Sequence, residues 1–343
     1  MGAFGRMCAR LGHALSPQKI WGLSLARGLC DHGGAGGAVC CPPLPSVGRP
    51  TVEGCVALWE GLFHERGVPE PRLSSEYIIA HILGAKTLAS LGSDRRTELL
   101  TDAQTRRVWE LCAKRLRRMP VQYVIEEWDF RELTLRMRPP VFIPRPETEE
   151  LVGLVLTDLR AGGGGDSPRV LEVGCGSGAV ALSLLHGLPQ ASVVAVDRSS
   201  EAISLTRANA LMLGLQDRLE VLQLDVSLDP RAVVSRCAPV DVLVSNPPYL
   251  FSTDMATLEP EILRYEDHAA LDGGDEGMSV ITQILALAPC VLSLGGKLYL
   301  EVEPRQPALV QQAVSEGQEA GLRYSATHTD LYGRPRFCVL QRI

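Results

Sequence analysis

Two kinds of hydrophobic pattern alternate along the chain from Arg169 onward. Short, nearly continuous apolar runs predict buried strands, and longer segments whose apolar residues recur every three or four positions predict helices. The predicted strands are 169–173, 192–196, 219–224, 240–245 and 296–302. The predicted helices are 179–188, 199–214, 277–294 and 307–321. This alternation predicts an α/β fold, with a mainly parallel, doubly wound sheet and helices on both faces.

The segment before this sheet has a different pattern. Residues 51–118 contain stretches with apolar residues on one helix face, which predicts a small helical domain. Residues 119–145 switch to short alternation of apolar and polar positions, which predicts a β-hairpin followed by a linker. A helix that begins near Glu147 then opens the α/β domain, which we assign to residues 146–343. The glycine-rich stretch 161–168 predicts a flexible surface loop or linker.

The first fifty residues carry several basic residues but one acid, Asp31, and they end in a run rich in glycine and proline. An acid-poor, arginine-bearing start that can form a cationic amphipathic helix is typical of a mitochondrial transit peptide. A secretory signal fits less well, because Gly, Gln and Lys interrupt the apolar residues. We therefore expect residues 1–50 to target the mitochondrion, with a merely disordered extension as the alternative.

Charge and cysteine spacing narrow the function classes further. The net charge of −6 does not favour a broad phosphate-binding surface. The ten cysteines contain no Cys-x-x-Cys pair, so we expect neither a metal site nor a disulfide framework. We therefore expect the protein to work in a reducing compartment. The longest apolar segment, 284–294, is too short to span a bilayer, so we expect no membrane association.

One local basic cluster stands out from this acidic background. It consists of Lys114, Arg115, Arg117 and Arg118. We expect a solvated helix end, where cations suit the helix dipole, and the alternative is a contact with an RNA-rich or acidic partner.

Three glycines separate the first predicted strand from the first predicted helix of the sheet: Gly174, Gly176 and Gly178. Glycine lets the chain turn tightly and brings the backbone close to a ligand. In an open α/β sheet, ligands bind beyond the carboxyl ends of the strands, where this loop lies. The spacing alone would serve a dinucleotide equally well. Cys175, inside the loop, has no base nearby in sequence, so we interpret it as a small residue beside the ligand rather than a nucleophile.

Acidic residues after the neighbouring strands narrow the choice of ligand. Asp197 follows the second strand, where a carboxylate can accept both ribose hydroxyls of an adenosine. Asp225 follows the third strand, where it can accept from an adenine amine, and Glu172 lies where an amino-acid group would bind. Acids along a cleft suit a cationic ligand better than a pyrophosphate, which points to S-adenosylmethionine. Helix capping is the alternative role for Asp197.

The stretch 244–251 ends a predicted strand with two prolines, which cannot continue a sheet. Asn246 offers a side-chain oxygen, and Pro247 offers a carbonyl that its ring and Pro248 hold rigid. Together they can accept from both N–H groups of an amide or aromatic amine and direct its nitrogen lone pair at a methyl group. Tyr249 can stack on the planar acceptor. We predict that Asn246, Pro247 and Tyr249 are catalytic and that, with Pro248, they bind the substrate. The alternative is a simple strand-ending turn.

With these motifs the chain resembles class I S-adenosylmethionine-dependent methyltransferases, and in particular the HemK/PrmC family of protein-(glutamine-N5) methyltransferases. The Asn-Pro-Pro-Tyr motif at 246–249 is shared with adenine-amine methyltransferases, whereas 142–152 and 259–277 are more particular to the glutamine enzymes. The likeness runs from about Val52 to the C-terminus and includes the small helical domain joined by a hairpin. Where the family often has glycine in the hairpin, this chain has Glu126-Glu127.

The resemblance implies transfer of a methyl group from S-adenosylmethionine to the glutamine side-chain nitrogen in the Gly-Gly-Gln loop of peptide chain release factors, with S-adenosylhomocysteine as product. It also implies that residues 51–118 dock the release factor, without need of nucleic acid. Joined to the transit-like start, it suggests the mitochondrial member, which acts in the matrix on mitochondrial release factors.

The resemblance also assigns residues to the cofactor and the cleft. The cofactor-binding set is Phe142, Arg145, Glu172, Gly174, Cys175, Gly176, Ser177, Gly178, Asp197, Asp225, Val226 and Asn246. Over the cleft mouth we expect Phe142, Arg145, Glu147 and Thr148.

Two other functions are compatible with parts of the sequence. A DNA or RNA adenine-N6 methyltransferase would need a basic, aromatic surface to hold a flipped base, and 114–118 is the candidate for it. A non-catalytic module could keep the cofactor fold as a scaffold for ribosomal partners, but the intact motif at 246–249 argues against it.

Overall fold

The structure is a computed structural model that describes residues 44, 48–163, 167–315 and 321–343. The prediction for residues 1–50 falls almost entirely outside the described residues, as do residues 164–166 of the predicted glycine-rich loop. The described residues all belong to one unit of the chain, Cys41–Ile343.

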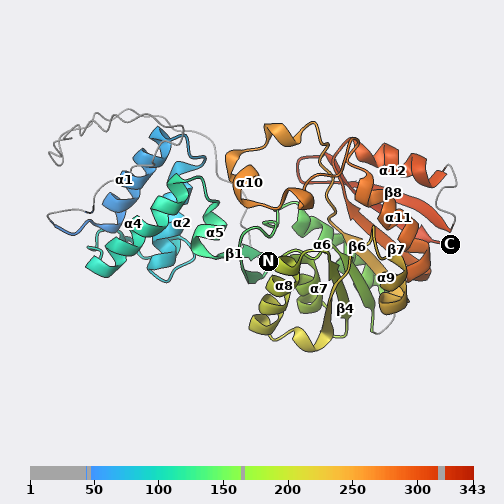
Figure 1. Ribbon diagram of the computed structural model, residues 1–343. Helices are drawn as coiled ribbons and strands as arrows, with labels where there is room; N and C mark the ends of the chain where they lie inside the picture. Colours follow the sequence, from blue (N-terminus) through green and yellow to red (C-terminus); the bar gives the residue numbers. More distant parts are fainter. Residues whose placement is uncertain (1–43, 45–47, 164–166, 316–320) are drawn as a thin grey trace. The chain divides into compact units, whose positions relative to one another are not determined.

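The first part of this unit is helical, as predicted (Figure 1). Its helices are α1 (Val52–Glu65), α2 (Pro71–Ile82), η1 (Leu88–Ser90), α3 (Ser93–Arg96), α4 (Asp102–Leu116) and α5 (Val121–Ile125). Thr51 begins α1 by accepting a hydrogen bond from the Gly54 N–H. The apolar helix faces form a core in which the rings of Trp59 and Trp109 meet edge to face at 5.2 Å.

The predicted hairpin is present as β1 (Glu127–Phe130), paired antiparallel with β2 (Leu133–Arg136). The strand-like prediction is wrong for residues 121–125, which form α5. Three consecutive residues of α5, 123–125, are buried, which a strand that exposes alternate residues would not allow. Glu126 then turns the chain with a φ of 62°, in the left-handed region where glycine is favoured.

The remainder of the unit is built on a seven-stranded sheet with the strand order β5-β4-β3-β6-β7-β9-β8. Its strands are β3 (Arg169–Val173), β4 (Ser192–Asp197), β5 (Leu219–Gln223), β6 (Val240–Ser245), β7 (Leu292–Glu301), β8 (Leu322–Thr329) and β9 (Pro335–Arg342). Strands β3 to β7 pair in parallel, and β9 pairs antiparallel with β7 and β8. The five predicted strands and the mainly parallel α/β fold are confirmed, whereas β8 and β9 were not predicted.

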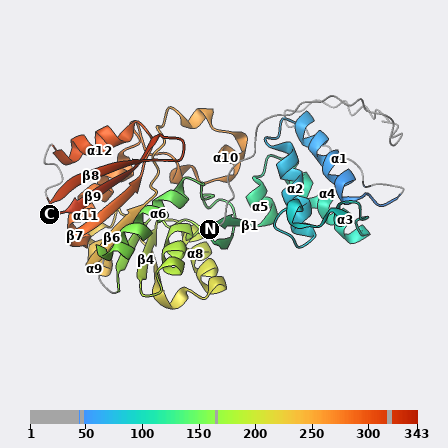
Figure 2. The same cartoon turned by 180° about the vertical axis from the view of Figure 1, so that it is seen from behind.

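Helices cover both faces of the sheet, as Figures 1 and 2 show. They are α6 (Thr148–Asp158), α7 (Ala179–Gly187), α8 (Ser200–Leu213), α9 (Pro230–Cys237), α11 (Ser279–Val291) and α12 (Gln306–Ser315), and the short α10 (Pro260–Tyr265) lies in the segment between β6 and α11. One core contains residues of α6, α7 and α8, and a second contains residues of α9, α11 and α12. Within β3, Val170 belongs to the first core and Leu171 to the second, because successive strand residues face opposite sides.

The predicted helix 277–294 is shorter in the structure. Helix α11 ends at Val291, and residues 292–294 open β7. The apolar run continues across this boundary, so hydrophobicity alone does not mark where the helix becomes a strand. None of the helices in the described ranges is long and apolar enough to cross a bilayer.

Candidate functional site

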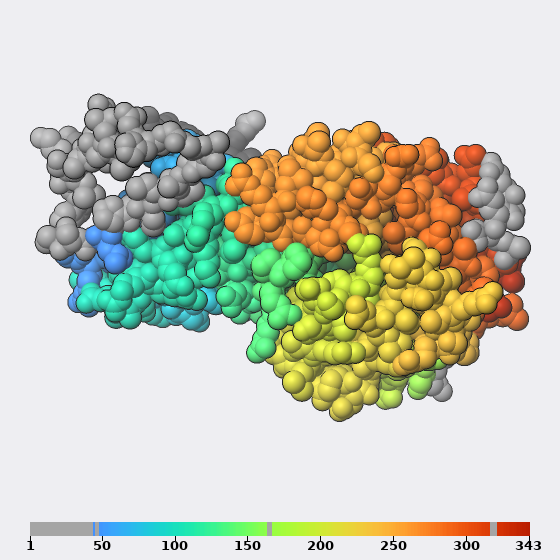
Figure 3. Space-filling model, viewed as in Figure 1, coloured from blue at the N-terminus to red at the C-terminus, as the bar shows by residue number. Residues whose placement is uncertain are grey.

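The loops that follow β3 and β6 border a crevice at the carboxyl ends of the parallel strands. These two strands are neighbours, but the chain continues from β3 to β4 on one side and from β6 to β7 on the other. Ligands of open α/β sheets bind at such a reversal. A cavity of about 280 Å³ lies there. In Figure 3 a recess separates the orange surface of residues 258–271 from the yellow-green surface of residues 196–202, and both segments line the cavity.

Most residues that the sequence analysis assigns to the ligand line this one cavity. They are Phe142, Arg145, Glu172, Gly174, Cys175, Gly176, Ser177, Asp197, Asp225, Val226, Asn246, Pro247, Pro248 and Tyr249. Gly178 does not line the cavity and precedes α7 with a φ of 84°. A Cβ atom there would lie 3.0 Å from Leu182 Cδ1 and 3.1 Å from Thr206 Cγ2. We therefore interpret Gly178 as a close-packing position.

Gly174 brings the two loops close together. Its φ of 79° lies in the left-handed region, and its N–H donates to the Val196 carbonyl at 2.8 Å. A Cβ atom on Gly174 would lie 3.9 Å from the backbone oxygen of Asn246. A larger side chain would therefore extend into the space between the glycine loop and the proline turn.

Asp197 ties the glycine loop to the end of β4. Its Oδ2 accepts from the Gly176 N–H at 3.0 Å, and its Oδ1 accepts from the Ser199 N–H at 2.9 Å. Burial raises the pKa of Asp197, and these two hydrogen bonds oppose the rise. The side chain that caps α8 is Ser199, which accepts from the Ala202 N–H, so capping does not explain Asp197. Each carboxylate oxygen keeps a lone pair for a ligand hydroxyl.

Two buried side chains lie beside the glycine loop. Glu172 is 2% exposed and accepts from the Ala181 N–H at 2.9 Å, and burial raises its pKa well above the usual range. Burial likewise raises the pKa of the Cys175 thiol, which disfavours the thiolate that a nucleophile requires. This supports the interpretation of Cys175 as a small residue beside the ligand.

Asp225 and Val226 follow β5 on another wall of the cavity. The Asp225 Oδ1 accepts from the Ser227 N–H at 2.8 Å, and Val226 is buried. Within the described part of the chain, no group of three or more His, Cys, Asp or Glu side chains is arranged to hold a metal ion.

Asn246 follows β6 with its side chain in a defined orientation. Its Nδ2 donates to Thr148 Oγ1 at 3.1 Å. The amide oxygen of Asn246 is thereby directed away from Thr148. Among the described residues, no donor pairs with that oxygen or with the Pro247 carbonyl. The end of β6 therefore presents two acceptors to a ligand that carries an NH₂ group.

The backbone of the proline turn is supported from behind. Gln306, at the start of α12, donates from Nε2 to the Tyr249 carbonyl at 2.8 Å and to the Gly277 carbonyl at 3.0 Å. Gly277 has a φ of 67°, and a Cβ atom there would lie 2.2 Å from the Tyr249 carbonyl oxygen. Glycine at 277 thus allows the second loop to hold the turn in place.

The Tyr249 side chain ends on a buried acid that sequence reasoning missed. Its hydroxyl donates to Glu301 Oε1 at 3.2 Å, and Glu301 is 1% exposed at the end of β7. A signal was present, because Glu301 lies at the carboxyl end of a predicted strand, 296–302, much as Asp197 lies at the carboxyl end of another. Gln306 carried no comparable signal.

The cavity mouth is formed where the two most family-specific stretches, 142–152 and 259–277, meet. The Arg145 guanidinium lies 4.7 Å from the centre of the Phe142 ring, and its Nη2 donates to Glu266 Oε1 at 2.7 Å. Thr148 lines the same cavity, whereas Glu147 does not and instead forms an ion pair with Arg334 at 3.4 Å.

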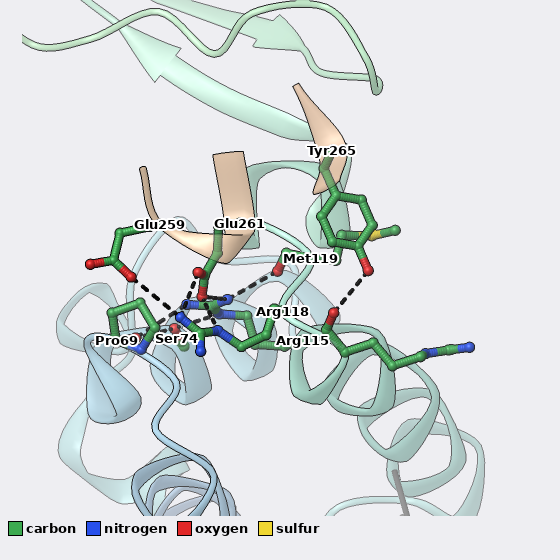
Figure 4. Close-up of polar contacts among 9 residues, drawn as sticks. Pro69, Ser74, Arg115, Arg118, Met119, Glu259, Glu261 and Tyr265 are labelled. Atoms are coloured by element: carbon green, nitrogen blue, oxygen red, sulfur yellow. Dashed lines mark hydrogen bonds and ion pairs between the residues drawn. The ribbon is translucent and has the colours of Figure 1, made fainter. Parts of the chain in front are cut away.

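Two of the four residues of the basic cluster at the end of α4, Arg115 and Arg118, form ion pairs within the protein (Figure 4). Arg115 is 4% exposed, and its Nη1 donates to Glu261 Oε1 at 2.9 Å. Arg118 donates to both carboxylate oxygens of Glu261 at 2.7 Å. The expectation of a solvated helix end is therefore wrong for Arg115, because its side chain is buried and paired. Local sequence did not reveal this, since the partner lies 146 residues away. Arg117 is exposed, and its carbonyl accepts from the Tyr265 hydroxyl at 2.9 Å.

Comparisons with known proteins find two matching family models and several similar proteins. Residues 56–125 match the PrmC N-terminal domain family, and residues 150–264 match the methyltransferase small domain family. A human protein named MTRF1L release factor glutamine methyltransferase is 51% identical over 305 residues, which cover 88% of this chain and 90% of that protein. The release factor glutamine methyltransferase of Deinococcus radiodurans is 37% identical over 279 residues, covering 80% of this chain and 93% of that protein. A solved protein-(glutamine-N5) methyltransferase (release factor-specific) from Alicyclobacillus acidocaldarius is 27% identical, covers 61% of this chain and 99% of its own, and has a TM-score of 0.37.

Proposed function

The chain belongs to the release factor glutamine methyltransferase family and is an enzyme of that activity, and we propose that S-adenosylmethionine is its methyl donor and the Gly-Gly-Gln loop of a mitochondrial release factor its acceptor. The product of the donor is then S-adenosylhomocysteine. The observation that carries the proposal is the pair of acceptors at the end of β6, the Asn246 side-chain oxygen and the Pro247 carbonyl, with which no donor among the described residues pairs.

These two acceptors address the main difficulty of the reaction. The lone pair of an amide nitrogen is delocalised into the carbonyl group, so the nitrogen is a poor nucleophile. Hydrogen bonds from both N–H groups to Asn246 and Pro247 favour a pyramidal nitrogen whose lone pair points toward the methyl group. Tyr249 holds the plane of the acceptor, and a fixed approach geometry of this kind lowers the barrier without acid–base chemistry. The proton leaves after transfer, from the cationic product.

The cavity residues suit the proposed donor. When bound there, S-adenosylmethionine supplies an electrophilic methyl group on a positively charged sulfur. Asp197 offers a free lone pair on each oxygen for the ribose hydroxyls, and the left-handed Gly174 leaves room beside the turn. Asp225 and Val226 would hold the adenine, and Glu172 lies near the amino-acid group. Phe142 and Arg145 would close the mouth over the cofactor.

The remaining segments complete the proposal. The helical region 51–118 docks the release factor, the hairpin and linker 119–145 connect it to the methyltransferase domain 146–343, and nucleic acid is not required. Residues 1–50 direct the protein to the mitochondrial matrix, in keeping with their arginines and single acid. A full-length fluorescent fusion should be mitochondrial and a fusion that lacks residues 1–50 should not; a full-length fusion outside mitochondria would contradict the location.

The acceptor is tested by incubating the enzyme with methyl-labelled S-adenosylmethionine and a mitochondrial release factor. The native factor should be labelled, and a matched factor with Gln→Ala in its Gly-Gly-Gln loop should not. Equal labelling of the two factors would remove the glutamine assignment.

An adenine-N6 methyltransferase is the alternative reading of the Asn-Pro-Pro-Tyr motif. Its candidate nucleic-acid surface was the 114–118 cluster, of which Arg115 and Arg118 are paired with Glu261. Salt-dependent retention of the enzyme on DNA or RNA, together with labelling of adenine, would favour this alternative over ours.

A further inference from the structure

Beneath the proline turn lies a buried carboxylate that the reaction outlined above does not use. Glu301 is 1% exposed, its Oε1 accepts from the Tyr249 hydroxyl at 3.2 Å, and its buried Oε2 has no hydrogen-bond partner in the described part of the chain. A buried charge with an incomplete set of hydrogen bonds is costly, so such a group in a native site calls for a reason.

Thr148 connects this carboxylate to the other polar side chain of the turn. It is 3% exposed, and its Oγ1 accepts from Asn246 Nδ2 at 3.1 Å. A hydroxyl carries one proton, and the Thr148 hydroxyl is among the groups that stabilise the ionised form of Glu301. Thr148 therefore lies between Asn246, which donates to it, and Glu301, whose ionised form its hydroxyl stabilises, while the Tyr249 hydroxyl donates to Glu301.

We propose that Glu301, acting through Thr148 and Tyr249, is a positioning residue that sets which end of the Asn246 amide faces the acceptor. This inference rests on the proposed function. An ionised carboxylate only accepts hydrogen bonds, so the Thr148 hydroxyl donates to it and offers its lone pair to Asn246. Asn246 must then turn its NH₂ to Thr148 and its oxygen to the acceptor.

A neutral group at position 301 removes this constraint. A protonated carboxyl or a glutamine amide can donate to Thr148, whose hydroxyl then donates to Asn246. Asn246 would turn its oxygen to Thr148 and present an NH₂ to the acceptor's own NH₂, which cannot form a hydrogen bond with it. Methyl transfer should therefore depend on the charge of Glu301 even though Glu301 touches neither substrate.

The surroundings of Glu301 raise its pKa into the pH range in which enzyme activity can be measured. Burial raises the pKa of Glu301 to about 7, against the opposing effects of the Thr148 hydroxyl, Arg336 and the Tyr249 hydroxyl, while Glu147 adds to the rise. Arg336 itself faces Asp330 at 3.7 Å, which moderates its effect on Glu301. Because the ionised form is the active one, kcat should increase as the pH rises through about 7.

The test compares Glu301→Gln with the wild type across pH 6–9, using the release factor as acceptor. We expect kcat to fall roughly 10²-fold and its dependence on pH near 7 to disappear, because misplacement of the acceptor costs about that much. Cofactor affinity, measured by calorimetry, should stay within a few-fold. The matched control is Glu220→Gln on β5, an exposed ion-pair partner of Arg236, which should keep the wild-type pH profile.

Thr148 gives an independent variant pair. Thr148→Val keeps the shape but removes the hydroxyl, so it should lose turnover as Glu301→Gln does, and Thr148→Ser should recover most of that loss. A Glu301→Gln enzyme with wild-type kcat and an unchanged pH profile would overturn the inference, as would equal turnover of the two Thr148 variants. The proposed function fails separately, if the wild type labels the Gln→Ala release factor.

Discussion

Two buried glutamates in this protein have opposite electrostatic surroundings. Glu261, in α10, is 7% exposed and accepts from Arg115 and Arg118 of the helical region. Burial alone would raise the pKa of Glu261, but the hydrogen bonds from Arg118 and Arg115 lower it below the ordinary value. Glu301, at the proline turn, is 1% exposed and is bonded to a neutral phenol, and burial raises its pKa to about 7.

The difference separates a structural charge from a functional one. Charge compensation makes Glu261 a permanent anion that joins α4 to α10, whose residue Ile262 lines the cavity. Incomplete compensation leaves Glu301 able to change its protonation state near the working pH, which is typical of groups at active sites. Both side chains are shielded from solvent, but Glu301 is the more deeply buried and lacks a paired arginine, so depth of burial and partners together decide the role.

The largest effect is expected on turnover, from a change in the proline turn at the end of β6. Asn246→Ala should reduce kcat roughly 10³-fold, because it removes one of the two acceptors that orient the amide. Cofactor affinity by calorimetry and the urea midpoint of unfolding should change little. Near-normal turnover would show that the proline turn does not orient the acceptor. The region around Glu301 would then have no catalytic role to contrast with the structural role of Glu261.

The next largest effect is expected on stability, from the ion pairs of Arg115 and Arg118 with Glu261 that bridge α4 and α10. Arg115→Met should destabilise the protein by about 3 kcal/mol, since it leaves Glu261 buried with one cation fewer. The measurement is the free energy of unfolding in urea. The double variant Arg115→Met/Glu261→Leu should recover much of the loss, because replacing a buried ion pair with apolar residues is often neutral. A double variant no more stable than the single one would contradict this account of the bridge.

The pH dependence of stability should differ in sign between the two glutamates. Glu261, with a lowered pKa, stabilises the fold above its ordinary pKa of 4.5, and this contribution is lost as the pH falls through the lower folded value. Glu301, with a raised pKa, favours the fold below 4.5, and this contribution is lost as the pH rises to about 7.

Urea unfolding of the wild type and Glu301→Gln at several pH values measures the second contribution. The difference in unfolding free energy between the two proteins should change between pH 4.5 and 7 and be constant above 8. A constant difference across the whole range would show that Glu301 does not titrate there.

The smallest effect is expected from the exposed neighbour in the basic cluster. Arg117→Ala should change the free energy of unfolding by less than about 0.5 kcal/mol, because the bond from Tyr265 goes to the Arg117 backbone carbonyl and survives. The same variant serves as the matched control for Arg115→Met. A loss as large as that of Arg115→Met would mean that cluster charge in general, and not the buried pair, holds α4 to α10.

Local patterns were sufficient for most of the fold. The five parallel strands have nearly continuous apolar runs, because both faces of the sheet are covered by helices. β8 escaped prediction because it lies at the sheet edge, where most of its residues are exposed or half-buried and the apolar signal is weak. The boundary between α11 and β7 was misplaced since both elements are apolar.

Among candidate site residues, the sequence determined those whose place follows from the ends of strands. Gly174 and Asn246 come directly after strands and Asp197 ends one, and parallel pairing brings these strand ends to one edge, so their convergence could be expected. Only the tertiary structure decided how these residues are supported. Thr148 and Asn246, which are 98 residues apart in the sequence, are hydrogen-bonded, and so are Arg115 and Glu261, which are 146 residues apart. The burial that raises the pKa of Glu301 likewise arises only when distant segments enclose it. Sequence spacing records the local chain conformation, whereas desolvation and charge pairing depend on what folding brings near.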